Sequence, residues 1–291
     1  KLDKATEGVI KAMTLGDRSD LSPTVKTTYT QAGASHILAL SGMHLTIIFF
    51  IINLLMNWRK AELISQAIIV TTLWAYALLV GLSPSVTRSA FMISVYALLS
   101  VGYRDSAPIN TLSFTAIVML IINPLALYDV SFQLSYVAVC AILLGNSFFK
   151  KVIPIEWLMN HRIVKWIWGI TLVSLAAQIG TAPLVAYHFG VFNPCALLAN
   201  FFLIPLATLT IILTILALTT IWFPWLSDLF VMALSFVVKT MNHLLQLVTE
   251  IPYSHLNFEP FSVVLTLFIY ILMGFAFILY IKYLKMHCII K

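Results

Sequence analysis

The sequence has little charge and few cysteines, and each shortage narrows the class of protein. Charged residues make up 10% of the 291 positions, whereas hydrophobic residues make up 61%. A soluble domain of this length cannot bury so much apolar surface in one core, so we expect lipid to be the main solvent. The three cysteines, Cys140, Cys195 and Cys288, lie far apart and indicate neither a disulfide framework nor a thiolate metal site.

Long apolar runs are the dominant positive feature. A membrane span needs roughly 20 apolar residues, and backbone polar groups in lipid must be satisfied within helices. We therefore predict an all-α, polytopic transmembrane helical bundle with about eight to nine membrane segments. The predicted segments are 37–56, 63–82, 85–101, 109–128, 130–149, 163–187, 194–223, 226–248 and 261–283.

Two of these segments differ from simple spans. The run 194–223 is too long for one straight crossing, and Pro205 in its interior removes a backbone donor, so we expect a broken or kinked helix near Pro205. The segment that begins at Leu226 and ends at Val248 is predicted to be amphipathic, because polar residues recur along it at helical spacing. This polar stripe consists of Asp228, Ser235, Lys239, Asn242, Gln246 and Glu250.

Basic residues follow alternate segment ends, which predicts an orientation. They are Arg59, Lys60, Arg104, Lys150, Lys151, Arg162, Lys165, Lys282, Lys285 and Lys291. By the positive-inside rule the loops that carry them face the cytoplasm, so the amino terminus is expected outside and the carboxyl terminus inside. This requires the amphipathic segment to cross; if it lies along the interface instead, the basic tail is outside.

The first 35 residues differ from the rest of the chain. They carry charges of both signs and no long apolar run, so they are predicted to be neither a signal peptide nor a span. We expect residues 1–35 to be an extracytoplasmic lead-in, the end of a larger soluble part, and residues 36–291 to form the transmembrane domain.

Polar residues inside the predicted spans are the candidate site. With the predicted orientation they converge on the outer half of the membrane, where they would line a polar cavity with an Arg88–Asp129 ion pair. The candidates are His36, Ser41, His44, Arg88, Asp129, Gln133, Gln178, Thr181, Asn193 and Asn200. We expect no metal and no cofactor.

Each candidate also has a purely structural explanation. Asp129 directly precedes an apolar run and can cap that helix. Arg88 can extend to the outer headgroups, and His44 can be a buried, hydrogen-bonded histidine. Amides such as Gln178 and Asn200 can join neighbouring helices. A cation, an anion, a histidine and several amides at one depth nevertheless exceed what helix packing usually requires.

These residues fall within strings that resemble the ComEC family of competence proteins, the bacterial membrane channels for transforming DNA. The likeness covers nearly the whole chain. It rests on Leu15 to Asp17 (LGD), His36 to His44 (HILALSGMH), Pro84 to Arg88 (PSVTR), Asn123 to Asp129 (NPLALYD), Phe132 to Ser135 (FQLS), Ala177 to Leu184 (AQIGTAPL) and Asn200 to Pro205 (NFFLIP).

The resemblance implies an inner-membrane channel that passes one DNA strand after the other has been degraded outside, with no chemistry in the spans. Its partners would be single-stranded DNA, membrane lipid, a DNA receptor, an external nuclease and a cytoplasmic ATP-driven motor. The outer domain and nuclease domain common in the family are too large for this chain. The sequence also has no Walker motif, so we expect the pulling force to come from a partner.

Two other classes of function stay open at this point. A small-solute or ion transporter could use the expected break near Pro205 as a discontinuous-helix site. An intramembrane serine hydrolase could use Ser41 as nucleophile and His44 as base. A serine and a histidine on one helix turn rarely align for proton transfer, which makes the hydrolase the weaker alternative.

Overall fold

The computed structural model describes residues 2–55, 62–102, 108–149, 161–254 and 256–289. Within these ranges the chain is almost entirely helical, which confirms the predicted class. The exception is an antiparallel pair of two-residue strands, β1 (Val191–Phe192) and β2 (Leu256–Asn257). The helices are α1 (Lys4–Leu15), α2 (Pro23–Gln31), α3 (Ser35–Leu38), α4 (Gly42–Leu55), α5 (Glu62–Leu79), α6 (Pro84–Gly102), α7 (Pro108–Ile122), the 3-10 helix η1 (Pro124–Tyr128), α8 (Val130–Phe149), α10 (Arg162–Phe189), α11 (Ala196–Thr219), α12 (Pro224–Thr249) and α13 (Val263–Ile289).

Four helices of the described chain are long and apolar enough to cross a membrane, namely α10, α11, α12 and α13. Helices α4, α5, α7 and α8 are apolar but offer shorter apolar stretches. The chain is therefore a membrane protein, while the count of eight to nine spans stays a prediction. Several residues that carry the orientation prediction lie outside the described ranges: Arg59, Lys60, Arg104, Lys150, Lys151 and Lys291.

The predicted break at Pro205 is wrong. Helix α11 continues through Pro205, as α10 continues through Pro183. A proline removes one backbone donor, but the rest of the helix keeps its hydrogen bonds, and neighbouring helices support such positions in membranes. Helix α11 has 24 residues, because the ends of the apolar run lie outside it, so its length suits a single crossing.

The break lies instead in the first apolar segment, which was expected to be one continuous helix over 37–56. Helix α3 ends at Leu38, Ala39 has extended backbone angles, and α4 begins only at Gly42. Ser41 immediately precedes α4 and is well suited to cap it. The apolar side chains on both sides of the break hide this cap signal in the sequence.

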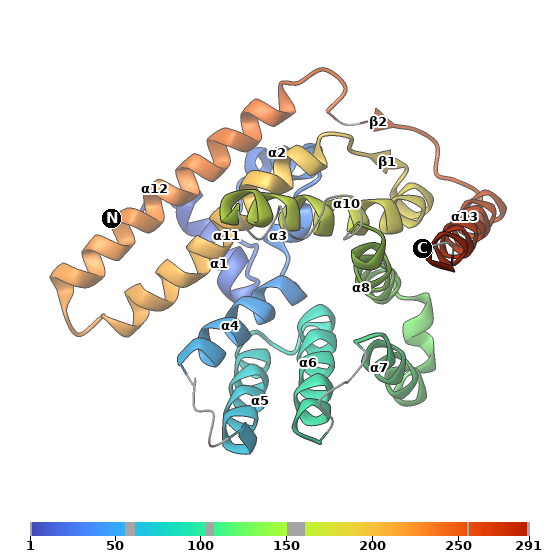
Figure 1. The fold of residues 1–291 in the computed structure, drawn as a ribbon. Helices are drawn as coiled ribbons and strands as arrows, with labels where there is room; N and C mark the ends of the chain where they lie inside the picture. Colours follow the sequence, from blue (N-terminus) through green and yellow to red (C-terminus); the bar gives the residue numbers. More distant parts are fainter. Residues whose placement is uncertain (1, 56–61, 103–107, 150–160, 255, 290–291) are drawn as a thin grey trace.

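Helix α12 is amphipathic, as predicted. Its buried residues, among them Val238, Met241 and Leu245, share one face, while Lys239 and Gln246 are exposed. The buried face packs against α11 and against α1 and α2 from the first 35 residues (Figure 1). The hydroxyl of the buried Tyr29 donates to Asn242 Oδ1 at 2.9 Å, which ties the polar stripe to α2.

Helix α6 occupies a central position in the other half of the molecule. It contacts α4 and α5, and it also contacts α7 and α8 (Figure 1). Helix α8 in turn packs closely along α10, where Gly180 leaves no room for a side chain against Ala141. Helix α13 lies at the edge, where its helix contacts are with α10. Polar residues of α4, α6 and α8 can therefore meet.

Candidate functional site

Arg88 is the centre of the polar cluster between α6 and α8. It is 3% exposed, and it is the only buried arginine or lysine in the described ranges. Its Nη2, which carries two N–H groups, has four acceptor oxygens within reach: the Ser131 carbonyl at 2.9 Å, Ser85 Oγ and Ser135 Oγ at 3.2 Å each, and Ser131 Oγ. Three serines thus replace the water that a guanidinium would otherwise bind.

The predicted ion pair is present. Arg88 Nη1 lies 3.4 Å from Asp129 Oδ2, and the side chain of Asp129 is 45% exposed. Asp129 Oδ1 also accepts from the Ser131 amide at 3.1 Å, at the start of α8. Asp129 therefore caps α8 and pairs with Arg88 at once. Arg88 does not extend to the headgroups, because it is buried between helices.

Three helix N-termini meet around this cluster. The first turns of α6 and α8 touch through Ser85 Oγ and Ser131 Oγ, which are 3.1 Å apart. Helix α4 reaches the same place, since a Cβ added to Gly42, its first residue, would lie 2.7 Å from Ser89 Oγ. A helix N-terminus carries about half a positive charge from its aligned peptide dipoles. The site therefore combines three positive helix ends with a buried cation.

His44 lies in the first turn of α4 and is 1% exposed. Its Nδ1 accepts from the Ser41 amide at 3.2 Å and lies 3.1 Å from Ser41 Oγ. His44 thus supplies one arm of a capping box, in which the side chain of the third helical residue accepts from the amide before the helix. Because Nδ1 accepts an N–H, the proton of the neutral ring is on Nε2, and Nε2 is buried with no hydrogen-bond partner among the described residues.

The remaining candidates do not join this cluster. Gln178 Nε2 donates to the Asn193 carbonyl at 3.0 Å, and Asn193 Nδ2 donates to the Thr30 carbonyl at 3.1 Å. These bonds tie α10 to the end of α2. Thr181 Oγ1 donates to the Ala177 carbonyl of its own helix, and Asn200 Oδ1 is buried with no partner within the described ranges.

Two more candidates lie at other contacts. His36 is exposed on α3, before the non-helical residues that separate α3 from α4. Gln133 Oε1 lies 2.9 Å from His188 Nε2, and Gln133 Nε2 donates to the Leu127 carbonyl at 2.9 Å. Gln133 thus joins α8 to α10, close in sequence to the Arg88 partners but through contacts of its own.

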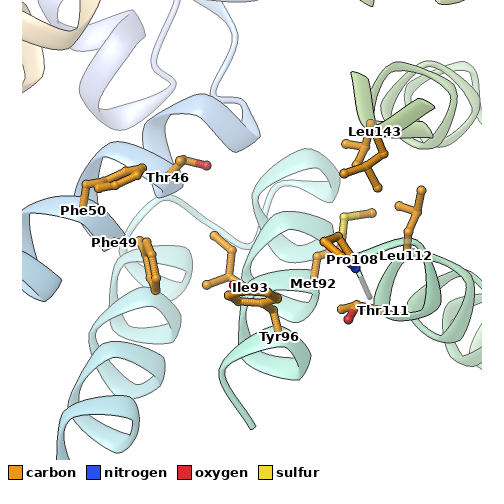
Figure 2. A pocket seen from close by; sticks show the side chains of 11 residues that line it. Thr46, Phe49, Phe50, Met92, Ile93, Tyr96, Pro108, Thr111, Leu112 and Leu143 are labelled. Carbon is orange, nitrogen blue, oxygen red and sulfur yellow. The ribbon is translucent and has the colours of Figure 1, made fainter. Parts of the chain in front are cut away.

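An apolar cavity of about 240 Å³ lies farther along α6 and α8. The same faces continue into it, because Met92 and Tyr96 follow Arg88 at four-residue spacing and Val139 follows Ser135. Figure 2 shows Phe49 and Thr46 of α4 on one side of α6, and Leu112 and Leu143 on the other. The lining residues are Thr46, Phe49, Phe50, Met92, Ile93, Tyr96, Pro108, Thr111, Leu112, Val139 and Leu143.

The serine partners of Arg88 and the histidine partner of Gln133 were not predicted from the sequence. Ser131 and Ser135 are four residues apart, so they share the helix face that meets α6. That spacing was available in the sequence, but serines are common packing residues in membrane helices. His188 carried no comparable signal. Within the described ranges, no group of three or more metal-ligating side chains is found.

Comparison with known proteins gives consistent matches. The model of the "Competence protein" family matches residues 13–283. "ComE operon protein 3" of Bacillus subtilis is 31% identical over 211 residues, which cover 70% of this chain and 25% of that protein. "Recombination protein 2" of Haemophilus influenzae is 24% identical over 69% of this chain and 26% of that protein.

An uncharacterized protein of Aquifex aeolicus is 30% identical over 205 residues, which cover 70% of this chain and 46% of that protein. The chain thus spans between about a quarter and a half of the length of these relatives. No solved structure matches the chain.

Proposed function

We propose that this chain, which belongs to the competence protein family that includes ComEC, forms a path for one strand of transforming DNA across the bacterial inner membrane. In this proposal the amino terminus is outside and the carboxyl terminus is in the cytoplasm. A separate receptor, an external nuclease and an ATP-driven motor would deliver and pull the strand.

The observation that carries the proposal is the buried Arg88 at three converging helix N-termini. A membrane protein places a cation in its interior at considerable cost, so such residues usually serve transport or a ligand. Nucleic acid is a chain of anions, and its backbone is attracted by positive helix ends as well as by side chains. One buried arginine suits a conducting path, because a site that binds too tightly does not release.

Our proposal assigns Ser41 and His44 to the structure of the α4 start rather than to hydrolysis. A hydrolase would need the histidine to take the serine proton while a third group orients the ring. Ser41 Oγ does lie 3.1 Å from His44 Nδ1, but Nδ1 also accepts from the Ser41 amide, and among the described residues Nε2 has no acceptor that would orient the ring.

The transporter alternative loses its original basis, because α11 is continuous at Pro205. A discontinuity does exist between α3 and α4, and it lies beside the Arg88 cluster. The same helix ends could attract a small anion. A DNA channel and a small-anion transporter are therefore distinguished by the size and chemical form of the solute that crosses the membrane.

Proteoliposomes that contain the whole chain test the proposal. A nuclease trapped inside the vesicles degrades any fluorescent DNA that enters, so passage is measured as loss of full-length strand. We expect single-stranded DNA to be degraded and a duplex of the same length to stay intact. Equal protection of both forms would contradict the proposal, and rapid flux of chloride or phosphate with no DNA entry would favour the transporter.

A further inference from the structure

Two buried nitrogens and two backbone amides near the meeting point of α4 and α6 have no acceptor in the described part of the chain. The nitrogens are Arg88 Nε and His44 Nε2. The amides are those of Gly42 and Met43 in the first turn of α4, where helices leave donors unused. We call these four groups the α4–α6 donor group.

Contacts between α4 and α6 place these donors in one region of the molecule. Gly42 abuts Ser89, the residue after Arg88, and Ser89 Oγ donates to the Ser85 carbonyl at 2.9 Å. Ser85 Oγ is itself an acceptor for Arg88. The start of α4 therefore lies against Ser89, and Ser89 and Arg88 both hydrogen-bond to Ser85.

The donor group calls for an anionic oxygen ligand. All four groups donate, and the two side-chain nitrogens are buried. Buried donors without acceptors are costly, so a ligand rich in oxygen acceptors would relieve them. The 14-residue α4 points its positive end at the site, and Arg88 adds a full charge. The Asp129 carboxylate cannot serve all of them, because its oxygens lie at Nη1 of Arg88 and at the Ser131 amide.

We propose that the α4–α6 donor group binds a phosphate oxygen of a nucleic-acid backbone, with His44 Nε2–H as its directed donor. This rests on the proposed function. Arg88 contributes charge and Nε–H, while its Nη atoms are held by the serines and Asp129. Ser41 orients the imidazole by occupying Nδ1. Because the donors address phosphate and no base, binding is independent of sequence.

Three substitutions of His44 separate binding from capping. His44→Gln keeps an acceptor for the Ser41 amide and an N–H donor. His44→Glu keeps the acceptor but replaces the donor with a negative charge. His44→Leu removes both. His243→Leu is the matched control, because His243 is exposed on α12 and lies away from the donor group.

The binding assay uses the whole chain in lipid nanodiscs with a fluorescent single-stranded oligothymidylate. We expect His44→Leu and His44→Glu to weaken binding about tenfold or more, as for loss of a hydrogen bond to a charged group. His44→Gln and His243→Leu should bind like the wild type. A methylphosphonate oligonucleotide, which lacks the backbone charge, should not bind. Thermal unfolding shows whether each variant is folded.

Other results would contradict the phosphate site, the proposed function, or both. If folded His44→Leu binds the oligonucleotide as well as the wild type, the phosphate site is wrong, although the proposed function stands. If the wild type binds inorganic phosphate in a His44-dependent way but binds no oligonucleotide, the anion site is supported and the DNA function is wrong. If it binds neither probe, both are wrong.

Discussion

Two regions of one helix pair contrast sharply in this molecule. At one end of the α6–α8 contact, Arg88 is surrounded by serine hydroxyls and Asp129. Along the same faces, one to two turns farther, the cavity of Figure 2 is lined by Met92, Tyr96 and Val139. The two ends lie on the same helix faces but differ in side-chain chemistry.

The contrast indicates how a conducting path can stay closed at rest. A polar end with positive potential attracts an anionic strand, whereas an apolar stretch excludes water and small ions by dewetting. For the proposed function we therefore expect the Arg88 cluster to attract the strand and the apolar cavity to resist leakage. Substitutions that change one end should leave the other function in place.

The largest expected effect comes from replacing the two residues of the Arg88–Asp129 ion pair one at a time. Arg88→Met should reduce DNA entry into vesicles at least tenfold, because the buried cation is lost. It should cost little stability, about 1 kcal/mol or less, since apolar residues often replace buried ions well. The half-exposed Asp129 can then be solvated by water.

Asp129→Asn should lose more stability and less DNA entry than Arg88→Met. Asparagine still caps α8, but the buried guanidinium loses its counter-ion, and we expect a loss of about 2 kcal/mol in unfolding free energy. DNA entry by the folded fraction should fall less than in Arg88→Met. Unfolding in detergent and vesicle entry measure the two quantities. If Arg88→Met is the less stable variant, Arg88 is chiefly a structural residue and the polar end loses its assigned role.

The next effect concerns how closely α4 approaches the polar end. Gly42→Ala places a methyl group against Ser89 Oγ and should cost about 1 kcal/mol through overpacking. Adding Ser89→Ala should recover the lost stability, because it removes the opposing Ser89 Oγ. Gly169→Ala is the matched control, since nothing lies within 4 Å of a Cβ added to that helical glycine. Equal unfolding midpoints for Gly42→Ala and Gly169→Ala would contradict the close approach.

These regions also show what the sequence could and could not predict. Helical class, the amphipathic α12 and the Arg88–Asp129 pair follow from periodicity and from the cost of charge in lipid. The interruption between α3 and α4 was not predicted, because the helix-capping signal of Ser41 is weak inside an apolar run. The helix-breaking effect of Pro205 was overestimated.

The grouping of polar residues was predicted only in part. Depth along a span can be estimated from sequence, but the direction in which a helix faces depends on tertiary packing. Arg88 and Asp129 therefore met as expected, whereas Gln178 and Asn193 bond to each other and to α2. Nothing in a single sequence indicates that Gln178 of α10 is linked through Asn193 to the end of α2.

A smaller effect is expected at the apolar end. Leu143→Ser introduces a hydroxyl into the lining of the cavity and should raise ion leakage through empty vesicles several-fold, because a polar lining is wetted more easily. DNA attraction at the Arg88 cluster should be unchanged. Leu272→Ser is the control, since Leu272 is 57% exposed on α13. Leakage equal to that of the control would show that the cavity is no barrier.

The smallest effect tests whether the cavity is dry. Thr111 is 5% exposed, and its hydroxyl has no partner in the described part of the chain, so Thr111→Val should raise the free energy of unfolding by about 1 kcal/mol. Thr115→Val is the matched comparison and should lower it, because Thr115 Oγ1 donates to the Leu112 carbonyl at 2.9 Å. If Thr111→Val is the more destabilising change, the hydroxyl binds water or a ligand in the cavity. The apolar end would then be wet, and the contrast with the Arg88 cluster would not explain closure.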